Sequence, residues 1–235
     1  MAPGFYPATR FRISGDRAVL AVYGEGVNPA INERVRRMAA LVNTLHHPAI
    51  EAVVPSYATL AVHYNPLEID CAGLIEFLLH LEQRLEEAVI SEAVIVEIPV
   101  CYGGEFGPDL AFVAAHNGID PEEVIRLHSA AAYRIYAIGF APGFCYLGGL
   151  DSRIHAPRLA TPRLRVAAGS VGIAGSQTGV YPLTSPGGWQ LIGRTPLCLF
   201  DPQRPRPIPY QAGDTIRFRP VPAEAFARLE QDTKR

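Results

Sequence analysis

Residues Gly169–Trp189, GSVGIAGSQTGVYPLTSPGGW, combine six glycines with short apolar runs and carry no charged side chain. Glycines and prolines between such runs predict short strands joined by tight turns. The spacing G-x-x-G-x-x-G differs from the dinucleotide-binding and phosphate-loop motifs, and no lysine follows it. GSQTG is not a nucleophile elbow, because its serine stands second rather than third. The stretch therefore predicts β-structure with a neutral, hydrogen-bonding surface.

Two interpretations of this surface stay open. Backbone N–H, hydroxyl and amide groups can orient a small polar ligand without a charge of their own. A tightly turned barrel segment would equally need these glycines for its backbone alone. If a ligand binds, the contact candidates are Gln177, Thr178, Tyr181 and Trp189.

The surrounding sequence extends the β pattern. Eleven of the 21 glycines fall between Gly139 and Gly193. Turn residues separate further β-like pieces, which are RVAAGSVGI, TGVYPL, WQLIG, PLCLF and DTIRF. Many short strands with such turns favour a barrel or sandwich. In GFAPGFCYLGGL, 139–150, three aromatic residues either fill that core or line a pocket: Phe140, Phe144 and Tyr146.

The N-terminal third alternates strands and helices. Strands are predicted at 17–24, on either side of Pro55-Ser56 within 51–64, and at 94–100, with an extra strand near 10–13. Helices are predicted after the capping residues Asn28 and Asp70. The order β-α-β-β-α-β is that of a ferredoxin-like α/β sandwich. We place the domain boundary near residue 92, which gives domains 1–92 and 93–235.

Two helices are expected between these regions, at 108–116 and from Asp120 to about 129, and a surface helix with a basic end at 222–235. Glu123 is placed for a capping box with Asp120. Helix-dipole complementarity explains the acidic residues at the helix starts, Asp109 among them. His128 lies late in its helix, where a positive ring would suit the dipole, so capping competes with catalysis as its role.

PRLATPR, 157–163, presents Arg158 and Arg163, each preceded by a proline that stiffens the chain. Either guanidinium can clamp a carboxylate or a phosphorylated intermediate. Ordinary salt bridges are the alternative. The seven histidines include no H-x-x-x-H pair, and the four cysteines no C-x-x-C, so we expect no metal site and reduced structural thiols.

Composition narrows the class of protein. The chain has 235 residues, of which 49% are hydrophobic and 19% charged, a globular balance. A net charge of −2 argues against nucleic acid and anionic lipid as partners. No run of 18 apolar residues predicts a membrane span, and MAPGFYPATRF lacks the pattern of a signal peptide. We therefore expect a cytoplasmic protein.

Several motifs together resemble one family. They are IPVCYGGEFGPDL, EEVIRLHS, GFAPGFCYLGGL, PRLATPR, GSVGIAGSQTGVYPLTSPGGWQLIGRTP and the late GD-x-x-RF, with VPSY near the start. The chain is similar to the family of 5-oxoprolinase B subunits, which also includes the kinase inhibitor KipI and allophanate hydrolase subunit 1. The strongest matches cover about 98–218.

The resemblance implies an α+β fold, with an N-terminal α/β sandwich domain and a C-terminal cyclophilin-like β-barrel. It implies a protein that acts with the A and C subunits of 5-oxoprolinase to cleave 5-oxo-L-proline, a lactam, to L-glutamate with ATP hydrolysis. Since this chain has no nucleotide motif, ATP is expected on a partner subunit or shared with one. A KipI-like inhibitor of a sensor histidine kinase and a role in allophanate hydrolysis remain alternatives. The resemblance assigns no catalytic residue; the pocket or interface candidates are His128, Arg158, Arg163, Gln177, Thr178, Tyr181 and Trp189.

Overall fold

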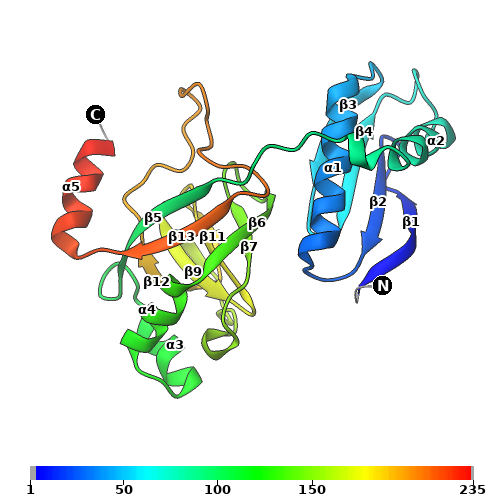
Figure 1. Ribbon diagram of the computed structural model, residues 1–235. Coiled ribbons are helices and arrows are strands. Elements are labelled where there is room, and N and C mark those ends of the chain that lie inside the picture. Colours follow the sequence, from blue (N-terminus) through cyan, green and yellow to red (C-terminus); the bar gives the residue numbers. More distant parts are fainter. Residues whose placement is uncertain (1–3, 234–235) are drawn as a thin grey trace. The chain divides into compact units, whose positions relative to one another are not determined.

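The computed structural model describes residues 4–233. The chain divides between Glu92 and Ala93 into two compact units. Each unit folds around its own large cluster of buried apolar side chains. The two units are therefore described one at a time (Figure 1).

The N-terminal unit is a four-stranded antiparallel sheet with two helices packed against it (Figure 1). Its sheet order is β1-β2-β4-β3. Val35 and Met38 of the first helix and Leu74 and Leu78 of the second are buried in one core. The elements are β1 Phe5–Ile13, β2 Ala18–Gly24, α1 Pro29–Leu45, β3 Ile50–Pro55, β4 Thr59–Tyr64, α2 Cys71–Glu82 and the 3₁₀ turn η1 Leu85–Glu87.

The predicted α/β sandwich is confirmed, but the β-α-β-β-α-β order counts one strand that lies beyond the predicted domain boundary near residue 92. The strand predicted at 94–100 belongs to the sheet of the C-terminal unit. The extra strand near 10–13 is real, and β1 takes the edge position beside β2. The edge strand that completes this sheet is therefore the first strand in the sequence. In the β-α-β-β-α-β order, the last strand in the sequence would complete the sheet instead.

Local signals placed the helix starts correctly. The side chain of Asn28 accepts hydrogen bonds from the N–H groups of Ala30 and Ile31, at 2.9 and 3.3 Å. Asp70 accepts one from Gly73 N at 2.7 Å. Such caps depend only on neighbouring residues, so the sequence reveals them.

The C-terminal unit is a nearly closed, barrel-like sheet of seven strands in the order β10-β9-β12-β5-β13-β6-β7. β13 runs parallel to β5, and the other pairs are antiparallel. The edge strands β7 and β10 contact one another. The strands are β5 Ile95–Tyr102, β6 Ala132–Ile138, β7 Cys145–Gly148, β9 Ser170–Ala174, β10 Gln177–Val180, β12 Gln190–Arg194 and β13 Thr215–Pro220. β8 Arg163–Val166 and β11 Ser185–Gly187 form a separate two-stranded sheet.

The helices of this unit are α3 Leu110–Asn117, α4 Pro121–Ala130 and α5 Ala223–Thr233, with a 3₁₀ turn η2 at Ser152–Ile154. α3 and α4 pack on one another at one end of the sheet (Figure 1). The expected basic end of the last helix lies at Lys234 and Arg235, outside the described residues. The α+β fold class with a C-terminal barrel is confirmed.

PLCLF, 196–200, was predicted as a strand and is not one. It lies in the long connection between β12 and β13. Five prolines interrupt that connection, at 196, 202, 205, 207 and 209. Proline has no N–H to donate to a sheet, so its density prevents regular strand pairing.

Candidate functional site

One pocket of about 290 Å³ opens on the C-terminal unit. Its wall comes from three separate segments, namely β7 with the turn before it, the irregular chain before β8 and the chain between β10 and β12. The glycine-rich stretch quoted first supplies half of it. The lining residues are Phe140, Phe144, Tyr146, Arg158, Pro162, Tyr181, Pro186, Gly187, Gly188 and Trp189.

Phe144 is the centre of the aromatic wall. Its ring meets those of Tyr146, Tyr181 and Trp189 edge-on, with centroids 5.1, 5.7 and 5.6 Å away. Phe144, Tyr181 and Trp189 are buried, while Phe140 is 69% exposed at the rim. Edge-to-face contacts hold aromatic rings in fixed relative orientations. The pocket therefore has a rigid apolar floor.

Tyr181 adds a polar group to this floor. Burial raises the pKa of its phenol, and a hydrogen bond with the Trp189 backbone and the guanidinium groups of Arg158 and Arg163 oppose that rise only in part. The phenol is thus a neutral O–H at physiological pH, able to donate one hydrogen bond.

The two candidate arginines have different surroundings. Arg158 lines the pocket and its side chain is exposed. Arg163 donates to Asp109 Oδ1 at 2.7 Å and to the carbonyl oxygen of Trp189 at 3.2 Å. Arg158 is the single cation among the described lining residues, and none of these is acidic. An anion entering the pocket meets the Arg158 guanidinium without a competing carboxylate.

Asp109 acts differently from its predicted role at a helix dipole. It precedes α3 but makes no side-chain capping bond. Its Oδ2 accepts from Leu191 N at 2.6 Å, while its Oδ1 receives Arg163. Together, Asp109 and Arg163 hold the backbone of β12 on both sides of Gln190. The pair thus braces the strand that begins directly after Trp189.

His128 lies in the barrel core rather than in the pocket. Its side chain is fully buried, and burial lowers its pKa to about 3. Thr178 donates its hydroxyl proton to Gly172 O at 3.0 Å. Thr178 must then accept from His128 Nε2–H at 2.8 Å, which leaves Nδ1 to accept from Tyr102 O–H at 2.7 Å. These contacts assign His128 as a neutral Nε2–H tautomer, and they contradict the idea of a positive ring facing the helix dipole.

The candidate residues therefore separate into two groups. The structure brings Arg158, Tyr181 and Trp189 together in the pocket. His128 and Thr178 belong to the buried network, and Gln177 is half-buried at the start of β10, outside the pocket lining. Sequence reasoning missed the contributions of Pro162, Pro186, Gly187 and Gly188.

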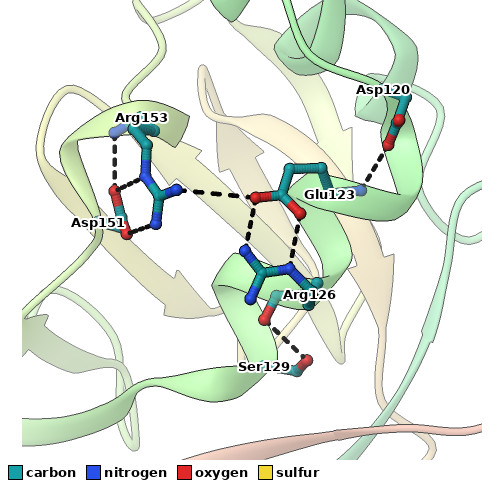
Figure 2. Close-up of polar contacts among 6 residues, drawn as sticks. All are labelled: Asp120, Glu123, Arg126, Ser129, Asp151 and Arg153. Atoms are coloured by element: carbon teal, nitrogen blue, oxygen red, sulfur yellow. Dashed lines mark hydrogen bonds and ion pairs between the residues drawn. The ribbon is translucent and has the colours of Figure 1, made fainter.

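A group of exposed ion pairs lies outside the pocket lining (Figure 2). Asp120 caps α4 by accepting from Glu123 N at 2.7 Å, as predicted. The predicted capping box also needs Glu123 to accept a hydrogen bond at the helix start, but its carboxylate instead accepts from Nε and Nη2 of Arg126, each at 2.6 Å. Arg153 approaches Glu123 to 3.7 Å and pairs with Asp151 at 2.7 Å. Exposed pairs of this kind are weakly stabilising.

Within residues 4–233, no three histidine, cysteine or acidic side chains gather as metal ligands would. In the same range, no helix has both the length and the apolar character needed to cross a membrane. All four cysteines are free.

Gly187 is required by the close approach of Tyr181. A Cβ at this position would lie 2.8 Å from Tyr181 Cε1 and Cζ. We expect Gly187→Ala to displace the ring and to lower the free energy of unfolding by about 1–3 kcal/mol. Urea unfolding followed by fluorescence of Trp189, the single tryptophan, measures this. Gly188→Ala is the matched control, since its Cβ would meet Pro162 at an ordinary 3.6 Å; equal losses from both variants would contradict the steric argument.

The chain matches the family model described as carboxyltransferase domain, subdomain C and D, over residues 9–210. A Bacillus subtilis (strain 168) protein that bears the name of the 5-oxoprolinase B subunit is 46% identical over 214 residues, covering 87% of this chain and 89% of that protein. The protein of the same name from Escherichia coli O157:H7 is 44% identical, covering 90% and 95%.

Solved structures agree with this relationship. The structure of TTHA0988 superposes with a TM-score of 0.77 at 36% identity, covering 87% of this chain and 40% of that chain. The chain therefore spans well under half of that longer protein. The Kluyveromyces lactis urea carboxylase superposes with a TM-score of 0.75 at 21% identity, covering 96% of this chain and 23% of that one. At that identity the likeness concerns the fold alone.

Proposed function

The chain belongs to the carboxyltransferase domain family of subdomains C and D, and from this premise we propose that it is the B subunit of an ATP-dependent 5-oxoprolinase. Its high identity to proteins that bear this name, along nearly their full length, supports this role. The observation that carries the proposal is the pocket itself. A rigid aromatic floor with one exposed guanidinium and no acid suits a small ring that bears one carboxylate.

In this proposal, Arg158 binds the carboxylate of 5-oxo-L-proline and the aromatic wall contacts its ring. The Tyr181 hydroxyl offers a hydrogen-bond donor to the lactam oxygen as negative charge develops there. The lactam oxygen attacks the γ-phosphorus of ATP and ADP leaves. Water then adds to the ring carbon, and the C–N bond breaks with protonation of nitrogen, which leaves the side chain as an acyl phosphate. A second water hydrolyses this acyl phosphate and releases glutamate and phosphate.

ATP itself fits this pocket poorly. A triphosphate needs several cations or a row of backbone N–H groups at a helix start. The described lining supplies one arginine and no helix terminus. We therefore assign ATP to the A or C subunits of the complex, or to an interface with one of them, and the substrate carboxylate to this chain.

The test uses the chain assembled with the A and C subunits and measures ATP-dependent formation of glutamate. Arg158→Ala should raise KM for 5-oxo-L-proline about ten- to a hundredfold, because a hydrogen-bonded charge pair is lost. Arg126→Ala is the matched control, since its guanidinium pairs with Glu123 outside the pocket lining (Figure 2).

An unchanged KM in correctly folded Arg158→Ala would overturn the pocket assignment. Turnover by the isolated chain would contradict a shared reaction. An assembled complex that cleaved allophanate instead, or that only inhibited a histidine kinase, would replace the proposed activity.

A further inference from the structure

The segment that carries Arg158 has no regular secondary structure of its own. It is held at three points. Gly175 N donates to Ala156 O at 2.7 Å, Gln190 Nε2 donates to Pro157 O at 2.9 Å, and Leu159 N donates to Gly188 O at 2.7 Å. The last two bonds lie on either side of Arg158. The backbone position of the pocket's cation is therefore set by partners outside its own segment.

Gln190 supplies the only one of these three bonds that comes from a side chain. It is 3% exposed, and its backbone is paired with Ile173 of β9. It also follows Gly188 and Trp189, which form the pocket wall facing Arg158's segment. One buried amide thus links the wall directly to the chain that presents the guanidinium.

We propose that Gln190 is a positioning residue that holds Arg158 against the aromatic wall for an anionic ligand. This inference rests on the proposed function, since it concerns how the carboxylate is bound. Gln190 does not line the pocket and touches no ligand in this arrangement. Its hydrogen bond restricts the conformations of the Pro157 backbone. Less conformational entropy is therefore lost when the ligand binds.

The effect expected from losing this bond is specific. Gln190→Met keeps the length of the side chain but cannot donate to Pro157 O. We expect KM for 5-oxo-L-proline in the assembled complex to rise about three- to tenfold, with kcat changed less than twofold. Gln203→Met, on the long connection before β13, is the matched control and should leave both constants unchanged. A general loss of structure would lower kcat and the yield of complex together.

A double-mutant cycle decides whether Gln190 works through Arg158. In the Arg158→Ala background, Gln190→Met should cause no further rise in KM. If the two effects multiply, or if Gln190→Met alone leaves KM unchanged, the positioning role is overturned while the pocket assignment stands. If Arg158→Ala alone leaves KM unchanged, the pocket assignment and the positioning role of Gln190 both fail, because Arg158 then does not bind the carboxylate.

A second variant covers poor folding of Gln190→Met. Gln190→Asn keeps a buried amide but is one methylene shorter, so it falls short of Pro157 O. It should reproduce the rise in KM and the absence of effect in the Arg158→Ala background. A normal KM in Gln190→Asn would contradict the role of the bond to Pro157.

Discussion

Replacing Asp109 by alanine is expected to lower the free energy of unfolding of the C-terminal unit by about 3 kcal/mol. The substitution removes the partner of Arg163, whose side chain is 29% exposed, and leaves its guanidinium partly buried without a counter-charge. It also removes the acceptor of Leu191 N, which then loses its 2.6 Å hydrogen bond. Both losses act at the start of β12, which is an interior strand of the seven-stranded sheet.

Trp189 fluorescence during urea unfolding reports this unit, since the tryptophan is the only one in the chain. Asp109→Asn keeps an oxygen that can accept from Leu191 N but lacks the charge, so it should lose roughly half as much stability. Glu123→Gln is the exposed control, because it changes a surface ion pair (Figure 2) and should hardly alter the midpoint. Equal midpoints for Asp109→Ala and the native chain would show that the brace does not stabilise β12.

Asp109 also illustrates where the sequence stops being informative. The sequence places it at a helix start, and this local position is correct. Its two partners lie 54 and 82 residues further along the chain. No local sequence pattern predicts contacts between residues so far apart. An interaction with the helix dipole was therefore the only role that could be predicted for Asp109.

The same distinction explains the rest of the prediction. Caps at Asn28, Asp70 and Asp120 depend on residues within one turn and were predicted correctly. The sheet that a strand joins depends on the whole fold, and the predicted β-α-β-β-α-β order therefore counted the strand now labelled β5 with the wrong sheet. The family resemblance predicted the barrel, since it draws on many positions at once.

Only part of the site could be predicted, because some of its features are local in sequence and others depend on the whole fold. Proline before each arginine indicated two fixed guanidinium groups, but only the fold decides which one faces the pocket. Aromatic residues in GFAPGFCYLGGL suggested a pocket or a core, and Phe144 serves in both. Gln190 gave no signal, because a glutamine in a strand has no motif and its partner Pro157 is 33 residues away.

The second large expected effect is a loss of stability at acidic pH, which depends on His128. His128 is neutral in the folded chain, with its pKa lowered by burial from 6.5 to about 3. The groups packed on its ring are uncharged, namely the Tyr102 and Tyr133 phenols, Thr178 and Phe218. Burial raises the pKa of both phenols, so they stay protonated as the pH falls.

The sign of the pH dependence follows from which state binds the proton. Above pH 6.5, His128 is neutral in both the folded and the unfolded chain, and its full contribution to stability is present. Below that pH the unfolded chain binds a proton that the folded chain excludes until about pH 3. Stability should therefore fall by about 1.4 kcal/mol per pH unit between roughly pH 6 and pH 4 because of this residue alone.

His128→Gln isolates this contribution. Glutamine can accept from Tyr102 and donate to Thr178, as the Nε2–H tautomer does, but it does not titrate. The other histidines and the carboxylates titrate in both proteins, so they cancel when the two pH profiles of unfolding free energy are subtracted. We expect the difference to change by about 3 kcal/mol between pH 6.5 and pH 4, with the variant less sensitive to acid. Parallel profiles would mean that His128 already takes up its proton in the folded barrel as the pH falls below 6.5, and they would contradict the lowering of its pKa by burial.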